Sequence, residues 1–503
     1  MRQFTNTKIK QIRIKRYQKI LQPLQLSCIK QLKIELEKLE NSVTSWTVCQ
    51  NCKGLGKKNR KQPKKSLIKQ ENIVSKNKQI SCKKCLGAGL IASIDYPKTD
   101  TENYPNIAII GGGIGGVALA VACLHRGIPF TLFERDKSFS DRSQGYGLTL
   151  QQASKAMKSL GINILKEGVI STKHVVHTTD GNIIGEWGMR KWMPANTIKS
   201  QKQTNIHIAR QSLRLALLEQ LGEPNNLQWG HQLLGFKESD GKIDLSFQVN
   251  GEIKTIKTDL LVGADGIRSS VRKLLLSEAT LPLHYLDCMV ILGICKLSAL
   301  ENIESPLLDS ATVFQTANGK ERIYIMPYDA DSVMWQLSFP ISEKEAKELS
   351  AKGAKYLKEE ACKRANWHAP IPEILTATLE SEISGYPVYD RELLTTELMQ
   401  SVKNTTLIGD AAHPMSPFKG QGANQALLDA LSLAREITKK CTKSSNWKEI
   451  GIRKSILNDF ESEMLSRSAI KVKDSAEAAK FLHSEIVLQE GDEPRGSVVR
   501  KIR

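Results

Sequence analysis

The sequence predicts an α/β protein: a Rossmann-like body built on a parallel sheet with an inserted β-sheet domain, preceded by a small cysteine module. Three observations support this fold class. A strand, a glycine-rich loop, a helix and a second strand follow one another between residues 106 and 134. Two later aliphatic runs stop at small-residue turns near residues 266 and 410. Two CxxCxGxG units precede the body.

Length and composition are those of a globular chain with two or three domains. The chain has 503 residues, of which 40% are hydrophobic and 25% are charged. Its formal charge of +19 is unevenly spread. Residues 1–104 contain 23 Lys and Arg against 7 Asp and Glu, and the remaining 399 residues contain 49 against 46. The basic character belongs to the N-terminal part, so we do not expect the nearly neutral body to bind nucleic acid through a broad basic surface.

Changes in composition divide the chain into five parts. Residues 1–48 are a basic arm with a short amphipathic helix, and residues 49–89 are a cysteine module around a lysine-rich middle. Residues 90–105 are a polar linker, which we expect to be a flexible joint with few buried contacts. The body spans residues 106–485, and residues 486–503 form a loosely held tail.

The first motif of the body has the residues of a dinucleotide-binding turn. Ile107–Ile110 supplies a buried strand, and Gly111, Gly113 and Gly116 form GxGxxG at its end. The first glycine permits a tight turn, the second lets the backbone approach a pyrophosphate, and the third lets helix and strand pack closely. The next helix points its N-terminus at the phosphates, and Glu134, after the second strand, can accept hydrogen bonds from ribose hydroxyls. The glycine pattern alone does not separate FAD from NAD.

Two further segments share a simpler pattern. DLLVGADGIRSSVR (Asp259–Arg272) contains the pair Asp265–Gly266, and LIGDAAHPMSPFKGQGANQALLDAL (Leu407–Leu431) contains Gly409–Asp410. In each, an aliphatic strand ends in a small-residue turn with one carboxylate, which can face the hydroxyl groups of a ligand without steric obstruction.

The three segments, in this order, resemble the flavoprotein monooxygenase family, which includes p-hydroxybenzoate hydroxylase, salicylate hydroxylase, zeaxanthin epoxidase and the tetracycline-inactivating monooxygenases. The resemblance covers about residues 106–480, and GYPVYDREL (Gly385–Leu393) is similar to the family as well. It implies an FAD-binding domain from residues 106–280 and 386–450. It also implies a substrate sheet inserted from about residues 170–205 and 281–385.

Site residues follow from the glycine motif and from this resemblance. Asp265 and Gly266 match the pair that the family places near the FAD pyrophosphate and the nicotinamide cofactor, and Asp410 matches its ribitol-binding carboxylate. Arg210 is expected beside the flavin, and Arg142 beside the nicotinamide cofactor. The cofactor-binding residues that we expect are Gly111, Gly113, Gly116, Glu134, Arg135, Arg142, Arg210, Asp265, Gly266, Gly409, Asp410, Pro417, Gly420, Gly422 and Asn424.

The resemblance also implies a reaction. NADPH or NADH reduces FAD, O₂ adds to the reduced flavin as a C4a-hydroperoxide, and an oxygen atom passes to an aromatic, polycyclic or isoprenoid substrate by hydroxylation or epoxidation. This chemistry requires no acid–base pair, so we name no catalytic residue, and we interpret His413 as a structural histidine. The candidate pocket residues Tyr324, Met326, Trp335, Phe339, Trp187 and Trp192 could equally be core residues.

The four cysteines of the module have the spacing of a metal site. Cys49 and Cys52 form one CxxCxGxG unit, and Cys82 and Cys85 form the other. Two such knuckles complete a tetrahedral four-thiolate zinc site, which is closed and therefore structural. The pattern resembles half of a DnaJ-type zinc finger. Redox dithiols or free thiols are the alternatives, and a protein chain, RNA or an anionic membrane could be the partner of the basic module.

Two other functions remain compatible with the sequence. One is an FAD-dependent reductase that transfers no oxygen, and the other is a zinc-ribbon binding or chaperone-like protein whose flavin domain is a scaffold. The six scattered cysteines suit a reducing compartment, and no transmembrane or secretory segment is evident. We therefore expect a cytoplasmic protein. An organelle presequence stays open, because the first acidic residue is Glu35.

Overall fold

The computed structural model describes residues 45–59, 79–141, 145–151, 153–189, 205–222, 226–276 and 282–494. Some predicted features fall outside these ranges. The basic arm and its helix, most of the lysine-rich middle of the cysteine module, Arg142, Trp192 and the end of the tail lie outside the described residues.

Five parallel strands form the central sheet of the body. Their spatial order is β12 (Leu227–Gln228), β6 (Phe130–Phe133), β5 (Ile107–Ile110), β16 (Leu260–Gly263) and β22 (Thr405–Leu407). Every residue of β5 and of β16 is buried, as is typical of a parallel sheet covered on both faces. The predicted Rossmann-like α/β class is therefore confirmed.

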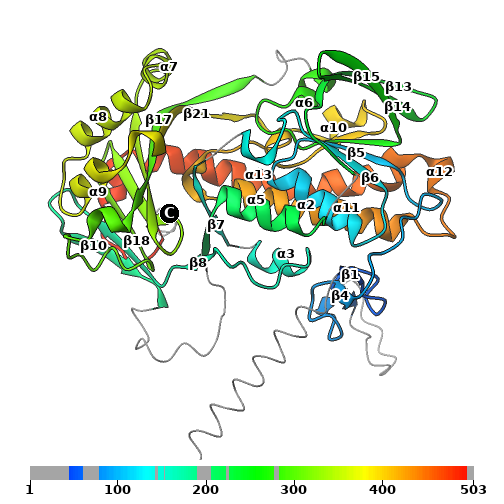
Figure 1. The fold of residues 1–503 in the computed structure, drawn as a ribbon, viewed down its shortest axis with the longest axis horizontal. Helices are drawn as coiled ribbons and strands as arrows, with labels where there is room; N and C mark the ends of the chain where they lie inside the picture. The colour runs from blue at the N-terminus through cyan, green and yellow to red at the C-terminus, as the bar shows by residue number, and fades with distance from the viewer. Residues whose placement is uncertain are drawn as a thin grey trace, which may run out of the picture.

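Helices pack against one face of this sheet and a small antiparallel sheet packs against the other (Figure 1). The helices are α2 (Ile114–Leu124), α5 (Arg210–Glu219) and α11 (Gly422–Lys440), with α3 (Ser154–Lys158), α12 (Trp447–Ile450) and α10 (Thr396–Gln400) nearby. The antiparallel sheet consists of β13 (Gln232–Ser239), β14 (Lys242–Val249) and β15 (Glu252–Thr258), and α6 (Ser270–Leu275) lies beside it. Phe133 of β6 stacks on Phe247 of β14 with 4.5 Å between the ring centroids, which joins the two layers.

A second, seven-stranded sheet forms the other half of the body. Its order is β10 (Ile183–Trp187), β9 (Lys173–His177), β18 (Thr312–Ala317), β19 (Arg322–Pro327), β20 (Ser332–Pro340), β17 (Leu283–Lys296) and β21 (Ile383–Arg391). Helices α7 (Glu343–Ala351), α8 (Ala354–Arg364) and α9 (Ile371–Ala377) lie beside it (Figure 1). Trp335 and Phe339 point into the hydrophobic core between sheet and helices, with no exposed surface. Of the two alternatives for these side chains, core packing is the one observed.

Two elements join the halves. Helix α13 (Asn458–Phe481) packs on α11, and its end packs on β18 of the large sheet. A small sheet of β7 (Gly147–Leu150), β11 (Ile206–Ala209) and β8 (Val169–Ile170) lies between them. The two halves therefore border a shared space near the start of α11.

The cysteine module consists of two short antiparallel strand pairs. One pair is β1 (Ser45–Val48) with β4 (Leu90–Ser93), and the other is β2 (Lys57–Asn59) with β3 (Gln79–Ser81). The module lies against the helices of the parallel-sheet half, near α3 and α11 in Figure 1. Trp46 packs tightly there, because a Cβ placed on Gly161 of the body would lie 2.5 Å from its Cδ1.

The segment after the module does not match the flexible joint that we expected. The Asp100 N–H donates to the Gly127 carbonyl oxygen at 2.9 Å, and the Trp447 indole N–H donates to the Asn103 carbonyl oxygen at 2.9 Å. A Cβ on Gly127 would lie 2.5 Å from the Lys98 carbonyl oxygen. The expectation of few buried contacts is therefore wrong, because backbone groups of this segment hydrogen-bond to the body. The domain boundaries themselves stay predictions.

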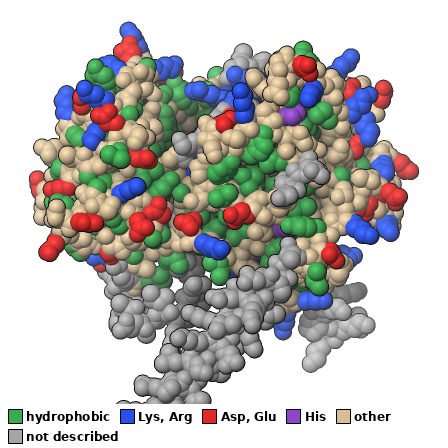
Figure 2. All heavy atoms as spheres, viewed as in Figure 1, with side chains coloured by type: hydrophobic (Ala, Val, Ile, Leu, Met, Phe, Trp, Pro, Cys, Tyr) green, Lys and Arg blue, Asp and Glu red, His purple; other side chains and the backbone are tan. Residues whose placement is uncertain are grey.

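The surface of the body carries both signs of charge. Figure 2 shows basic and acidic side chains interspersed over the face in view. Among the described residues, no helix is both long enough and apolar enough to span a bilayer.

Candidate functional site

A cavity of about 1650 Å³ lies between the two halves of the body. It runs from the carboxyl ends of β5, β6 and β16 to the inner face of the seven-stranded sheet. Pockets for single small molecules usually measure roughly 300–1000 Å³. This cavity therefore has room for a dinucleotide together with a second molecule.

The glycine motif forms the first wall of the cavity. Gly111 has a φ of +107°, and a Cβ there would lie 2.6 Å from the Ala264 carbonyl oxygen. Gly113 caps helix α2 and faces the cavity, where a Cβ would approach only Arg210 Nη2, at 3.9 Å. A Cβ on Gly116 would overlap the Gly111 carbonyl oxygen, so this glycine lets α2 pack on the end of β5. The three positions have the geometry that the motif requires of them.

Glu134 and Arg135 line the cavity at the end of β6. The Glu134 carboxylate accepts the Gly112 N–H at 2.6 Å and the Asp136 N–H at 3.0 Å. Glu134 is therefore held beside the glycine loop, and each of its oxygens has a second lone pair available for a ribose hydroxyl.

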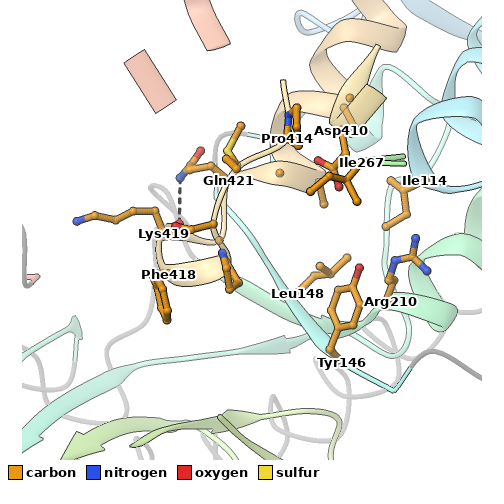
Figure 3. Close-up of a pocket in the computed structure, with 18 of the residues that line it drawn as sticks. Ile114, Tyr146, Leu148, Arg210, Ile267, Asp410, Pro414, Phe418, Lys419 and Gln421 are labelled. Atoms are coloured by element: carbon orange, nitrogen blue, oxygen red, sulfur yellow. Dashed lines mark hydrogen bonds between the residues drawn. The ribbon is translucent and has the colours of Figure 1, made fainter. Parts of the chain in front are cut away.

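Helix α5 brings two arginines to the same wall. The Arg210 guanidinium lies 5.3 Å from the Tyr146 ring centroid, and Figure 3 shows both side chains on one side of the pocket, across from Asp410. Arg214, one turn later, donates from Nε to the Gly112 carbonyl oxygen at 2.7 Å and lies over the Trp229 ring. The sequence prediction included Arg210 and missed Arg214, whose contact with the glycine loop spans about a hundred residues of sequence.

Asp265 and Gly266 also line the cavity, but the Asp265 carboxylate points at a helix end. It accepts hydrogen bonds from the Ser269 hydroxyl, from the Ser270 N–H at 2.6 Å and from the Val271 N–H at 3.3 Å. Burial raises the pKa of Asp265, and these donors lower it. Asp265 therefore positions the cavity wall by capping α6, and Gly266 is the half of the pair with an open face.

Asp410 faces the cavity from the turn after β22. Its carboxylate accepts no hydrogen bond from any side chain or backbone group of the described residues. The Asp410 side chain is exposed to the cavity. Its partial removal from bulk water raises its pKa, while the charges of His413 and Arg210 lower it. A carboxylate with free lone pairs that faces a cavity is suited to accept hydrogen bonds from a polyhydroxyl ligand.

The next loop carries four of the expected cofactor residues. Pro417, Gly420 and Gly422 line the cavity. Asn424 does not: it is fully buried, its Oδ1 accepts the Gln151 N–H at 2.9 Å and its Nδ2 donates to the Thr149 carbonyl oxygen at 2.9 Å. The expectation of a direct cofactor contact for Asn424 is therefore corrected, because its amide already ties the start of α11 to β7.

His413 is buried behind this loop and does not line the cavity. Its Nε2 lies 2.7 Å from Oδ2 of Asp429 on α11. The interpretation of His413 as a structural histidine agrees with this position.

The far end of the cavity is apolar and aromatic, with one buried cation. Three of the candidate pocket residues, Tyr324, Met326 and Trp187, line it together with Val313, Phe314, Leu292, Met334 and His174. Arg322 is 5% exposed; its Nε donates to Gln315 Oε1 at 2.7 Å, and its guanidinium lies 4.8 Å from the Tyr324 ring centroid. Burial lowers the pKa of Arg322 to about 10, so it remains charged near neutral pH. No carboxylate among the described residues forms an ion pair with it.

Comparison with known proteins identifies the family. A family model described as an FAD binding domain matches residues 104–447. The aurachin C monooxygenase/isomerase of Stigmatella aurantiaca is 30% identical over 334 residues, which are 65% of this chain and 79% of the relative. The chain belongs to the FAD-dependent monooxygenase family. It is of the NAD(P)H-dependent class.

Other relatives of this monooxygenase agree. The chloroplastic zeaxanthin epoxidase of Oryza sativa subsp. japonica is 25% identical over 350 residues, covering 68% of this chain, and the chain spans 50% of that relative's length. HpxO of Klebsiella pneumoniae, solved with FAD and uric acid, superposes with a TM-score of 0.62 at 18% identity and covers 79% of this chain and 91% of its own. The structural likeness supports the fold.

The cavity residues of this monooxygenase fit FAD. The N-terminus of α2 and the adjacent arginines supply donors and positive charge for a pyrophosphate. Among the described residues nothing donates to the Asp410 carboxylate, which could therefore accept hydrogen bonds from a ribitol chain, and the N-terminus of α11 could supply positive potential to a flavin ring. The cavity wall thus has a suitable group for each of three parts of FAD: the pyrophosphate, the ribitol chain and the flavin ring.

The four cysteines of the module come together in a second site. Their Sγ atoms lie within 4.8 Å of one another, and all four residues are buried. The Gly56 N–H donates to Cys52 Sγ and the Gly89 N–H to Cys85 Sγ, each at 3.2 Å. A Cβ on Gly56 or on Gly89 would overlap a carbonyl oxygen of the opposite knuckle. The two knuckles are thus arranged to hold one metal ion between four sulfurs.

Proposed function

We propose that this flavoprotein uses NADPH or NADH and O₂ to hydroxylate or epoxidise an aromatic, polycyclic or isoprenoid molecule. The observation that carries the proposal is that the cofactor-binding motifs and the inner face of the seven-stranded sheet line one and the same cavity. Bound FAD, reduced by the nicotinamide cofactor, supplies the activated oxygen. The chain's own residues bind, orient and enclose the reactants.

The expected cofactor residues have separate tasks in this proposal. Glu134 accepts the adenosine ribose hydroxyls, and Gly113 exposes the N-terminus of α2 to the pyrophosphate. Asp410 accepts hydrogen bonds from the ribitol hydroxyls. Gly420 and Gly422 leave the N-terminus of α11 accessible to the flavin ring, where its positive potential favours a negatively charged ring.

The substrate end contains polar side chains that stay uncharged near neutral pH. Burial raises the pKa of Tyr146, Tyr324 and Tyr386, and burial lowers the pKa of His174 to about 4. None of these groups is a strong base at neutral pH, so we still assign no catalytic acid or base. Their part is to line a largely apolar space that keeps water from the reacting atoms.

Arg322 narrows the substrate class. A buried cation without a carboxylate partner is costly unless a ligand supplies charge or acceptors. The Gln336 amide nitrogen, also on the cavity wall, is buried and has no acceptor among the described residues. We propose that the substrate is a mainly apolar ring system with an anionic or carbonyl oxygen directed at Arg322.

A substrate screen tests this function. We expect a ring compound that bears a phenolate, enolate or carbonyl oxygen to accelerate NAD(P)H consumption in the presence of O₂. Arg322→Gln should raise KM for that compound by about 10–100-fold, and Arg322→Lys should recover part of the loss. If no ring compound accelerates NAD(P)H consumption while a non-oxygen electron acceptor does, the reductase alternative is favoured instead.

We also propose that Cys49, Cys52, Cys82 and Cys85 bind one structural zinc ion. Four buried sulfurs leave no open position for a substrate, which supports a structural role. Metal analysis of the purified protein and of a Cys49→Ser, Cys82→Ser variant tests this site. One zinc per chain is expected in the first and none in the second, and a metal-free wild-type protein would contradict the assignment.

A further inference from the structure

Two arginines of the flavin body face the cysteine module. Arg126 follows the C-terminal end of α2 and is 4% exposed, and Arg435 lies towards the C-terminal end of α11 and is partly buried. A Cβ on Gly54 of the first knuckle would lie 4.0 Å from Arg126 Nε. Negative charge on the Cys52 sulfur would raise the pKa of both guanidinium groups, and negative charge on the Cys85 sulfur would raise that of Arg435.

Neither arginine has a counter-charge among the residues of the flavin body that the structure describes. Arg126 donates from Nη1 to the Ala122 carbonyl oxygen at 2.9 Å, but its Nε and Nη2 are buried without an acceptor. Arg435 donates from Nη2 to Ser159 Oγ at 3.1 Å, and its Nε is buried without an acceptor. No carboxylate in the described ranges forms an ion pair with either. A buried and a partly buried cation that also repel each other would destabilise the fold unless something nearby is negative.

A metal-bound tetrathiolate provides that negative charge. Four thiolates around one divalent ion form a dianion, whereas four neutral thiols carry no charge. The two arginines and the dianion would then balance one another across the contact between body and module. The partner of the module in this structure is thus the chain's own flavin body.

The same two helices reach the cofactor cavity. Gly113, Ile114 and Gly115 at the start of α2 line the cavity, as do Gly422 and Ala423 at the start of α11. The 11 residues of α2 span about 16 Å, so its two ends touch the two sites. The helices also pack on each other. A change of charge at their C-terminal ends is therefore placed to alter how their N-termini meet the cofactor.

We propose that the metal-loaded cysteine module is the counter-ion of Arg126 and Arg435, and that it couples metal binding to FAD binding through helices α2 and α11. This inference rests on the zinc site proposed above. In place of a module joined flexibly to the body, it describes one thermodynamic unit, in which each ligand favours the binding of the other.

The experiment measures FAD affinity of the full-length protein by flavin fluorescence, with zinc bound, after chelation, and after Zn²⁺ is restored. Chelation should weaken FAD binding roughly 5–150-fold, and Zn²⁺ should reverse the change. In an Arg126→Met, Arg435→Met variant the effect of chelation on FAD affinity should shrink, because the charges that need the dianion are gone. Lys448→Met, an exposed change on α12, is the control that should behave as the wild type.

The outcomes separate the two proposals. Absence of metal from the wild type would overturn the zinc site and the coupling together. Bound zinc whose removal leaves FAD affinity unchanged would overturn the coupling alone. If the double Met variant does not fold, Arg126→Lys and Arg435→Lys keep the positive charges and should preserve the response to chelation, and loss of that response would contradict the counter-ion role.

Discussion

The imidazole of His413 and the carboxylate of Asp429 form a buried pair directly behind the cofactor cavity, with 2.7 Å between Nε2 and Oδ2. The same carboxylate oxygen accepts the Gly409 N–H at 2.8 Å, and the other oxygen accepts a hydrogen bond from Arg467 Nη2 at 2.9 Å. The pair therefore fixes the turn that presents Asp410 to the cavity. Sequence patterns did not identify Asp429 or Arg467, because their partners lie 16–38 residues away along the chain.

The His413–Asp429 pair predicts that the free energy of unfolding depends on pH. Burial alone would lower the pKa of His413, but the charge and hydrogen bond of Asp429, together with the charge of Asp410, outweigh burial and raise it above its ordinary value of 6.5. The stabilisation from a raised histidine pKa is complete below the ordinary value and is lost as the pH rises through the raised value. His413→Asn should therefore lower the free energy of unfolding by about 3 kcal/mol near pH 6, and by less near pH 9. Thermal unfolding across this range checks the trend, and a difference that grows with pH would contradict it.

The close packing at Gly116, the third glycine of the first motif, predicts that alanine there lowers stability more than alanine at the neighbouring Gly115. A Cβ on Gly116 would overlap the Gly111 carbonyl oxygen, whereas a Cβ on Gly115 would lie 3.4 Å from the nearest atom, Cβ of Ala426. Gly116→Ala should lower the free energy of unfolding of the FAD-free protein by about 1–3 kcal/mol, because α2 must move away from β5. Gly115→Ala should leave the unfolding midpoint nearly unchanged. Denaturant unfolding after removal of FAD compares them, and equal stability of the two variants would refute the close approach.

Asp410 predicts a loss of cofactor affinity. Because its carboxylate has no hydrogen-bond partner in the described protein, Asp410→Ala should leave the fold intact and weaken FAD binding by about 1–3 kcal/mol. Asp410→Asn, which keeps one acceptor oxygen, should lose less. Glu348→Ala on the exposed face of α7 removes a carboxylate far from the cavity and serves as the control. FAD retention by Asp410→Ala equal to that of the control would exclude the ribitol role.

For Asn424 we predict a loss of stability rather than a direct loss of FAD affinity. Its side chain joins β7, the Gly420 carbonyl oxygen and the start of α11 without touching the cavity. Asn424→Ala leaves buried backbone groups without partners and should destabilise even the FAD-free protein by about 1–3 kcal/mol. Differential scanning calorimetry of FAD-free wild type and variant measures this. A variant that loses FAD affinity but keeps wild-type stability would restore Asn424 as a direct contact.

The features that the sequence predicted are those in which local residues determine local geometry. The GxGxxG turn, the paired cysteine knuckles and the α/β class depend on glycines and spacings within short segments. Arg322 and Arg214 were missed because only tertiary structure brings them to the cavity, and in sequence a lone arginine is more often solvated. The segment 90–105 was misjudged for the same reason, since its polar residues find hydrogen-bond partners on the body.

The most direct test of the central claim is the origin of the oxygen in the product. With a substrate that accelerates NAD(P)H consumption, the reaction is run once under isotopically labelled dioxygen and once in labelled water. The mass of the product is measured by mass spectrometry. We predict that one labelled oxygen atom appears in each product molecule and that none comes from labelled water. A product that is reduced without gaining oxygen, or that gains its oxygen from water, would contradict a monooxygenase function.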